Sequence, residues 1–271
     1  MTAFQKVIKY LAIVIAVILL VGIIVGVLGA TALKDKHAPA GESAVYDDIK
    51  TFAVAGDITV LDVEINAADF KIKYGDSFAV ESNLKRLTVD DKGGVLTIKD
   101  GGKMPGATYS DAVLTVYIPA DTVFEKLSLE TGACRFTADS LAANVVKLRF
   151  GAGEVSINEL TAAFSADIEG GAGQLTVSGG ALNEADVEMG AGQLNLTAVL
   201  TGECDFDLGV GESNITVLGR RADYELEIEK GLGGITVDGV SVTNVDDDRN
   251  CLNSIDLSGG VGAINLNFTQ P

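Results

Sequence analysis

Short runs in which apolar and polar residues alternate recur along the C-terminal half of the chain, and two closely spaced glycines follow each run. The stretches VKLRF, ADVEM and CDFDL alternate strictly, and the glycines stand in contexts such as GGAGQLTV and MGAGQLNL. A period of two is typical of a β-strand that buries one face. A second alternating run, for example Leu194 and Leu196, follows the glycines. We therefore expect each repeat to supply at least two short strands with a corner between them.

The repeats have a period near twenty residues. The first glycines of successive corners are spaced 19, 20, 19, 19, 22 and 29 residues apart. A regular period of this size predicts a stacked array, because a unit of two short strands cannot bury its apolar side without neighbours. Five and three residues before each of these glycines the chain carries an apolar pair, expected to point inward: Leu127 and Leu129, Val146 and Leu148, Ala166 and Ile168, Ala185 and Val187, Cys204 and Phe206, Leu226 and Ile228, Ile255 and Leu257.

The predicted fold is all-β. We expect a β-solenoid, similar to a parallel β-helix, with coils of about twenty residues, and an antiparallel β-sandwich is the alternative architecture. The strand-rich segments between Ile58 and the first corner are expected to form irregular opening coils of the same domain, because no linker separates them from the repeats. Near the C-terminus the segment SVTNVDDDRNCLNS interrupts the period, so the pattern does not fix the place of the final coil.

The paired glycines are interpreted as structural corners. They resemble the start of a dinucleotide-binding loop, but that motif needs a third glycine and a following helix, whereas the residues after Gly173 continue as a strand. Glycine is expected because a corner uses backbone angles that side chains disfavour, and the Ala or Val between two glycines is expected to point inward. No cofactor site is predicted. The predicted corner residues are Gly132, Gly151, Gly153, Gly171, Gly173, Gly190, Gly192, Gly209, Gly211, Gly231, Gly233, Gly260 and Gly262.

The N-terminal region carries a long apolar segment. Residues 10–33 hold no charge, and a helix needs about 20 such residues to cross the hydrocarbon core of a bilayer. We predict a cytoplasmic tail over residues 1–9, a transmembrane helix over 10–33, a juxtamembrane linker over 34–56 and the β-repeat solenoid over 57–271. The tail is short and the chain after the span becomes acidic, so we expect a single-pass protein of the cell membrane with an extracytoplasmic body.

Charge and composition limit the function. The formal net charge of the 271 residues is −18, which disfavours binding to nucleic-acid phosphates. The three cysteines form no CxxC pair, and the only histidine, His37, lies beside the predicted span, so a catalytic triad with histidine is excluded from the folded region. We expect no enzyme activity, no cofactor and no nucleic-acid partner, with the membrane contacted through residues 10–33.

The outward positions of the strands before the corners carry paired carboxylates. In stacked coils these side chains form rows, which suit a basic partner or divalent cations such as Ca²⁺; a solvated face that discourages edge-to-edge association is the alternative. Weak candidates for a metal site are Asp246, Asp247 and Asp248 in the C-terminal insert. The candidate binding face consists of Asp167, Glu169, Asp186, Glu188, Asp205, Asp207, Glu227 and Glu229.

Several other side chains have structural interpretations. Cys204 falls in the inward column and is expected to be buried, whereas Cys134 replaces a corner glycine and is expected to be more exposed. The aromatic residues nearest the repeats, Phe150, Phe164 and Phe206, are expected in the core, which leaves no aromatic platform for a sugar. The Asn-x-Ser/Thr triplets are interpreted as ordinary solenoid surface; they begin at Asn195, Asn214 and Asn267.

The chain resembles a family of bacterial β-strand-repeat proteins of unknown function that are labelled "putative adhesins". The resemblance rests on LDVEINAADFKIKYGDS, VLTIKDGG, LTVYIPADTVFEKLSLETGA and the repeated DIEGGAGQLTV pattern, and it covers most of the chain beyond about residue 51. It implies a cell-envelope protein with a repetitive β fold, tethered by an N-terminal helix, with relatives near envelope-stress signalling systems. The family carries no catalytic residues to transfer.

Three functions are compatible with the sequence. The first is a membrane-anchored, non-catalytic module that binds a cell-envelope component or acts as a spacer. The second is an accessory regulator of an envelope-stress system that binds a membrane protein. The third is an enzyme acting on polysaccharide through a carboxylate pair such as Asp186 and Glu188.

Overall fold

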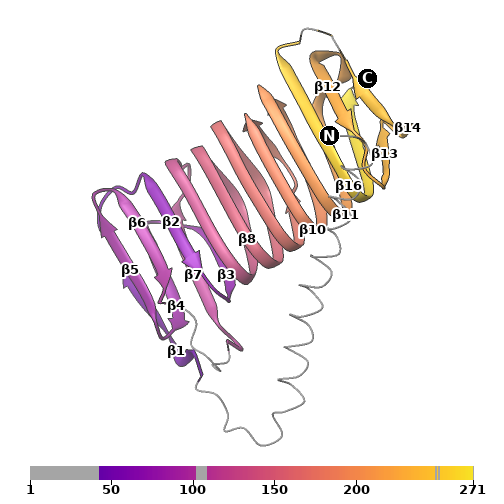
Figure 1. The fold of residues 1–271 in the computed structure, drawn as a ribbon. Helices are drawn as coiled ribbons and strands as arrows, with labels where there is room; N and C mark the ends of the chain where they lie inside the picture. Colours follow the sequence, from indigo (N-terminus) through magenta and orange to yellow (C-terminus); the bar gives the residue numbers. More distant parts are fainter. Residues whose placement is uncertain (1–42, 102–108, 248, 250, 271) are drawn as a thin grey trace, which may run out of the picture. The chain divides into compact units, whose positions relative to one another are not determined.

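The computed structural model describes residues 43–101, 109–247, 249 and 251–270. These residues form strands throughout, with one short 3-10 helix (Figure 1). The elements are β1 (Val45–Ala53), β2 (Val60–Ile65), β3 (Asp69–Gly75), β4 (Ala79–Leu84), β5 (Leu87–Lys92), β6 (Val95–Asp100), β7 (Val113–Pro119), β8 (Val123–Val177), β9 (Gly180–Asn183), β10 (Ala185–Thr201), β11 (Glu203–Arg220), η1 (Arg221–Asp223), β12 (Tyr224–Glu229), β13 (Gly234–Val237), β14 (Val240–Val242), β15 (Asn244–Asp246) and β16 (Asn253–Gln270).

Successive repeats pair side by side as parallel strands. Val187 of β10 lies opposite Ile168 of β8 on one side and opposite Phe206 of β11 on the other, so the register equals one repeat. The pairing continues around the corners, because Gly192 faces Gly173 and Gly211 in the same way. The β-solenoid expectation is therefore confirmed, and the alternative of an antiparallel sandwich is wrong for these central coils.

Each central coil has three sides. The first side precedes the glycine corner, the second side follows it, and a short third side returns the chain to the next coil. On the third side, β9 pairs in parallel with the end of β10 and with residues 160–162 of β8. The coil formed by the end of β8 and by β9 has its first side at residues 166–170, its second side at 173–178 and its third side at 180–183. In β10 the three sides are residues 185–189, 192–198 and 199–201, and in β11 the first two sides are 204–208 and 211–217. Residues 160–162 form the third side of the coil before these.

The core fills the space inside the coils. All seven apolar pairs predicted to point inward are buried, from Leu127 to Leu257. Phe150 and Phe206 are also buried, but Phe164 is 62% exposed, so its assignment to the core is wrong. Phe164 lies at the turn between the third side of one coil and the first side of the next, where the alternation that fixes inward positions is interrupted.

The residue between the corner glycines does not fill the core. Ala152 is exposed, Val210 is half-buried, and Leu232 is 66% exposed. The expectation that the Ala or Val between two glycines points inward is wrong, because the flanking glycines make the bend and the residue between them lies on its outer side.

The order of the coils departs from the order of the sequence at both ends. At the C-terminal end β16 lies between β11 and β12, pairing in parallel with both. At the N-terminal end β2 lies between β6 and β8, and β3 lies between β7 and β8. At the C-terminal end the chain thus leaves a layer between β11 and β12 that β16 fills, whereas at the N-terminal end β6 and β7 add outside β2 and β3 before β8 adds on their other side.

Antiparallel strands close both ends of the stack. At one end β5 pairs with β6 and β4 pairs with β7, and β1 adds to β4. At the other end β15 pairs with β12 and β14 with β13. Short or charged terminal strands of this kind discourage further strand addition. Because β1 belongs to the sheet, the predicted linker over 34–56 extends too far, and ordered structure begins before residue 57.

The predicted membrane span over 10–33 and the tail before it lie outside the described residues. Within the part of the chain that the structure describes, no helix is long and apolar enough to cross a bilayer.

Candidate functional site

The corner glycines stack directly on one another. A Cβ on Gly211 would overlap the carbonyl oxygen of Gly192, and a Cβ on Gly192 would overlap that of Gly173. Gly211 also has φ +144°, a backbone conformation that residues with side chains rarely adopt. The backbone of each corner pairs with the next coil, so the glycines serve the stacking of the solenoid rather than a phosphate group.

The carboxylates of the candidate binding face form two rows along the first side. In the inner row Asp186 lies between Asp167 and Asp205, and in the outer row Glu188 lies between Glu169 and Asp207. The sequence suggests that these rows continue directly from β11 to Glu227 and Glu229, but the order of the coils is different. The C-terminal coil is inserted before Glu227 and Glu229, and it brings Asp256 into the inner row and Ser258 into the outer row.

One end of the rows is neutralised by basic side chains. Lys147 Nζ lies 3.0 Å from Asp167 Oδ2, and Arg149 donates to Glu169 Oε1 at 2.6 Å. Arg149 also approaches Asp167 at 3.8 Å. Further along, the described residues include no lysine or arginine that forms an ion pair with Asp186, Glu188, Asp205 or Asp207. The unpaired part of the face therefore begins one coil beyond Asp167.

The electrostatics of the unpaired carboxylates follow from this arrangement. Partial burial raises the pKa of Asp186, and the neighbouring Asp167 and Asp205 raise it further. Partial burial likewise raises the pKa of Glu188 and of Asp256, with neighbouring carboxylates adding to it. Partial burial and nearby like charges thus disfavour the ionised form of these three carboxylates.

An open hollow runs beside the outer row. It has a volume of about 540 Å³, and its floor is the corner backbone at Gly151, Gly171 and Gly190. Glu169, Glu188 and Asp207 line one border. The hollow is shallow and continuous with the surface, so a ligand there contacts several coils rather than one pocket.

The second side carries uncharged polar rows, for which the sequence predicts only an ordinary solenoid surface. Asn214 Nδ2 donates to Asn195 Oδ1 at 3.1 Å, Asn265 Nδ2 donates to Asn214 Oδ1 at 2.9 Å, and the Thr236 hydroxyl donates to Asn265 Oδ1 at 2.9 Å. We call this chain of four side chains the amide ladder. The triplets at Asn195 and Asn214 were visible in the sequence, but Asn265 joins them only because its coil is inserted after β11.

Comparison with known protein families identifies the domain. The profile of the family Toastrack DUF4097 matches residues 58–248, which is well over half of the chain. The chain belongs to the Toastrack DUF4097 family. The match ends before β16, the segment that fills the penultimate layer of this Toastrack stack.

Solved structures of similar proteins come from several bacteria. The chain is similar to a "putative adhesin" from Parabacteroides distasonis, with 16% identity, a TM-score of 0.47, and coverage of 83% of this chain and 98% of that one. A "putative adhesin" from Bacteroides fragilis has 12% identity, a TM-score of 0.40 and coverages of 82% and 98%. A "putative cell adhesion protein" from Clostridium sporogenes has 14% identity, a TM-score of 0.35 and coverages of 82% and 99%. No curated protein matches the chain.

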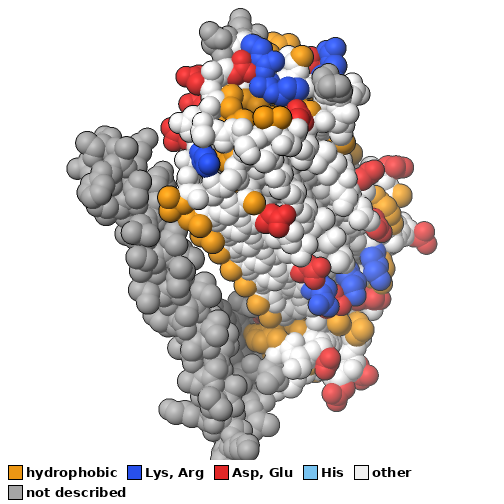
Figure 2. Space-filling view, turned by 90° about the vertical axis from the view of Figure 1, so that its right-hand side faces the viewer, with side chains coloured by type: hydrophobic (Ala, Val, Ile, Leu, Met, Phe, Trp, Pro, Cys, Tyr) orange, Lys and Arg blue, Asp and Glu red, His pale blue; other side chains and the backbone are white. Residues whose placement is uncertain are grey.

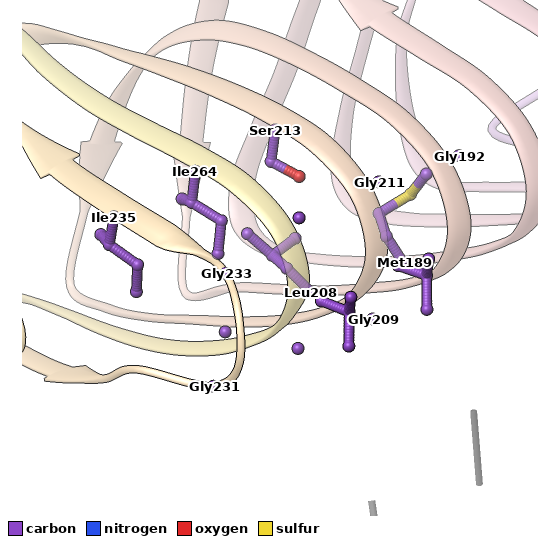
Figure 3. Close-up of a pocket in the computed structure, with 15 residues that line it drawn as sticks. Met189, Gly192, Leu208, Gly209, Gly211, Ser213, Gly231, Gly233, Ile235 and Ile264 are labelled. Atoms are coloured by element: carbon purple, nitrogen blue, oxygen red, sulfur yellow. The ribbon is translucent and has the colours of Figure 1, made fainter. Parts of the chain in front are cut away.

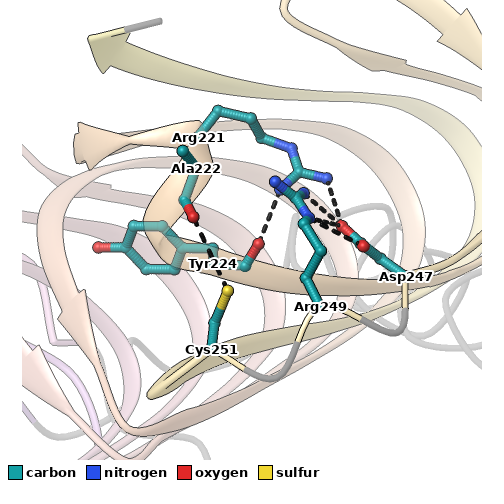
Figure 4. A network of polar contacts seen from close by, with 6 residues as sticks. All are labelled: Arg221, Ala222, Tyr224, Asp247, Arg249 and Cys251. Atoms are coloured by element: carbon teal, nitrogen blue, oxygen red, sulfur yellow. Dashed lines mark hydrogen bonds and ion pairs between the residues drawn. The ribbon is translucent and has the colours of Figure 1, made fainter.

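The insert of this Toastrack chain carries a polar network rather than an open acidic loop (Figure 4). Arg221 Nη2 lies 3.0 Å from Asp247 Oδ2, and Arg249 Nε donates to the two Asp247 oxygens at 2.8 and 2.7 Å. The hydrogen bonds from Arg249 are the main cause that lowers the pKa of Asp247 to about 2, with Arg221 contributing.

The arrangement disfavours the metal site suggested for the insert. Both oxygens of Asp247 are directed to guanidinium groups, and Asp246 faces Glu227 across the β12 and β15 pair. Asp248 lies outside the described residues. In the described ranges, no group of three or more metal-binding side chains comes together.

The inner side of the Toastrack corners contains a cavity of about 10 Å³ (Figure 3). Ser213 lies between Leu194 and Ile264 in the register of the second side, so a small polar side chain stands where its neighbours carry large apolar ones. Gly259 leaves a further gap opposite Leu208. The space is too small for an organic ligand, and it holds about one water-sized sphere.

The cysteines of the described Toastrack domain are free thiols. Cys204 is buried, as predicted. Cys134 is buried as well, so the expectation of greater exposure is wrong; its side chain turns into the core and the sulfur lies 3.9 Å from the carbonyl oxygen of Ile65. Burial raises the pKa of Cys134 to about 11, which makes it an unreactive thiol at neutral pH.

Proposed function

We propose that this Toastrack chain is a membrane-anchored, non-catalytic binding module of the bacterial cell envelope, with its solenoid outside the cytoplasm. The observation that carries the proposal is the set of side-chain rows on the flat sides of the stack. Each row repeats one chemical group at the spacing of neighbouring strands, about 4.8 Å. A surface of this kind suits an extended partner that touches several coils in succession.

The acidic rows favour a cationic partner for the first side. Asp186 and Glu188 stand beside other carboxylates without a basic neighbour, so an approaching cationic group lowers the repulsion within the rows. Lys147 and Arg149 already do this for Asp167 and Glu169 inside the protein itself. A basic segment of an envelope or membrane protein has the matching chemistry, and the acidic field also speeds its association at low ionic strength.

The site geometry argues for binding rather than catalysis. The hollow beside the outer row is open and is floored by glycine backbone. Phe150 is among the residues that line the hollow, but its side chain is buried, so it offers no exposed ring face to position a sugar for hydrolysis. Repeated, equivalent carboxylates lack the division into one acid and one base that glycoside hydrolysis requires.

Protease shaving tests the topology on which the proposal depends. Intact cells that produce the full chain are treated with protease, and peptides released from residues beyond Lys50 are identified by mass spectrometry, with lysed cells as the control. Release from intact cells is the expected result. Protection in intact cells with cleavage after lysis contradicts an exposed binding module and would favour a regulator that faces the cytoplasm or lies within the envelope.

A further inference from the structure

The second side differs from the rest of this acidic protein because it is nearly free of charge. On β10, β11 and β16 its outward positions between residues 193–198, 212–217 and 263–267 hold one charged residue, Glu212, and no lysine or arginine. Figure 2 shows a broad field of uncharged side chains and backbone, interrupted by isolated acidic groups. A strongly charged partner therefore has no electrostatic reason to bind this side.

The amide ladder makes this side rigid. Three hydrogen bonds link the side chains of Asn195, Asn214, Asn265 and Thr236 across four adjacent coils. Asn214 also donates to Glu212 Oε1 at 3.1 Å, which fixes the orientation of its amide. Side chains held by their neighbours lose little conformational freedom when a ligand binds, which favours affinity.

A second polar row beside the ladder is open. Thr197 lies opposite Thr216, and Thr216 lies opposite Asn267, so three half-buried polar side chains follow one another along the stack. Within the described residues, none of the three side chains forms a hydrogen bond to protein. Two hydroxyl groups and one amide therefore remain available as both donors and acceptors, at the spacing of one coil.

We propose that the amide ladder and the row formed by Thr197, Thr216 and Asn267 bind an extended, uncharged polysaccharide that runs along the stack. This inference rests on the proposed function as a binding module, and it assigns the ligand class to the second side rather than to the acidic first side. A neutral glycan offers hydroxyl and amide groups that donate and accept, as this surface does. The strand spacing of about 4.8 Å is close to the length of one sugar unit in an extended β-linked chain, so each coil meets one sugar.

Other partners fit this side less well. A peptide that binds by strand addition needs an open sheet edge, but the backbone of the second side already pairs with a coil on both sides. Protein partners are commonly anchored by large aromatic or arginine side chains, and Thr197, Thr216 and Asn267 provide no apolar pocket to receive one. An anionic glycan lacks a cation here and meets Glu212 instead.

Affinity must come from several coils together. The open row has no aromatic ring on which a sugar can stack, so each sugar contributes hydrogen bonds alone, or about a fivefold gain in affinity for each unit added. Short oligosaccharides are therefore expected to bind weakly and polymers to bind well.

The test measures binding of the full chain, solubilised in a polyoxyethylene detergent, to chitin beads as the neutral polymer and to polygalacturonate beads as the anionic polymer. Soluble N-acetylglucosamine oligomers of two to six units compete for the chitin beads. Thr216→Arg places a long charged side chain on the open row, and Thr161→Arg makes the same change on the third side, where Thr161 is also half-buried. Circular dichroism and thermal midpoints verify that both variants fold.

We expect retention on chitin and not on polygalacturonate, competition that strengthens with oligomer length, and a loss of about tenfold in affinity for Thr216→Arg with no loss for Thr161→Arg. If Thr216→Arg does not fold, the double change Thr197→Ala and Thr216→Ala removes the hydroxyl groups without added bulk. Equal retention on both polymers, no retention on chitin, or equal losses in the two arginine variants overturns the inference. The shaving result is independent of these outcomes. If the chain is exposed on intact cells but does not bind chitin, the proposed ligand is wrong and the proposed binding module is not affected.

Discussion

The stacking of the corner glycines leads to a sharp prediction for Gly211→Ala. The new methyl group would overlap the carbonyl oxygen of Gly192 in the adjacent coil, and the backbone at Gly211 has φ +144°. Two penalties therefore act together. The overlap involves backbone rather than a flexible side chain, so only a separation of the two coils relieves it.

The expected cost follows from the two penalties. A residue with a side chain in this backbone region costs about 1–3 kcal/mol, and forcing extra volume into a packed site costs about 1–3 kcal/mol more. We expect the free energy of unfolding to fall by about 4 kcal/mol, and in a domain of this size that lowers the thermal midpoint by roughly 10 °C.

Substitutions at two other glycines allow the backbone penalty and the overlap penalty to be measured separately. Gly239 has φ +74° and open space where a Cβ would stand, so Gly239→Ala carries the backbone penalty alone, about 1 kcal/mol. Gly234 also has open space, and its φ is not positive. Gly234→Ala is therefore expected to be neutral or to stabilise by about 0.5 kcal/mol through the unfolded chain.

The assay is thermal and urea unfolding of the full chain in detergent, followed by circular dichroism in the β-sheet region. The expected order of midpoints is Gly234→Ala, then Gly239→Ala, then Gly211→Ala. If Gly211→Ala costs no more than Gly239→Ala, the corners do not stack as closely as described, and the structural account of the paired glycines is refuted.

Three further changes test the core, the acidic rows and the insert. Ser213→Val fills the cavity of about 10 Å³ and is expected to raise the thermal midpoint by an amount equivalent to about 0.5–1 kcal/mol; a lower midpoint would mean that Ser213 holds a bound water. Asp186→Asn removes a carboxylate whose pKa is raised, so it should stabilise by about 0.5 kcal/mol at pH 7. That advantage should shrink as the pH falls through the raised pKa of Asp186, because the wild-type group then becomes protonated, and a pH-independent difference contradicts the cause. Asp247→Asn should destabilise the domain by about 1–2 kcal/mol at pH 7. Because the pKa of Asp247 in the folded state is lowered to about 2, the wild-type chain should lose this stabilisation as the pH falls from about 4 to about 2. If the difference in unfolding free energy between the two chains does not change with pH, the ion pairs of Asp247 are excluded.

The local architecture of the solenoid follows from the sequence alone. Alternation before and after each corner identifies the buried pairs, for example Ala185 and Val187, because side chains of a strand point to opposite faces in turn. The period near twenty residues predicts that equivalent residues of successive coils lie side by side, which the parallel register of β10 with β8 and β11 confirms. The rows of carboxylates on the first side follow from the same two rules.

The rules fail where the alternation is interrupted. Phe164 and the residue between two corner glycines lie at bends, and neither is buried as expected. Cys134 stands in a corner without its second glycine, and there the bend turns the side chain inward. At such positions the direction of the side chain depends on the backbone of the turn rather than on a period.

The order of the layers at the two ends is decided only by the tertiary structure. Coils with the same period and the same inward column can pair with one another in any order, so the sequence does not specify that β16 enters between β11 and β12. That insertion places Asn265 between Asn214 and Thr236, and Asp256 between Asp205 and Glu227. The sequence by itself determined the repeated coil and its faces, because these depend on local periodicity. The composition of the rows on each face depends on which coils become neighbours, and long-range packing alone makes that choice.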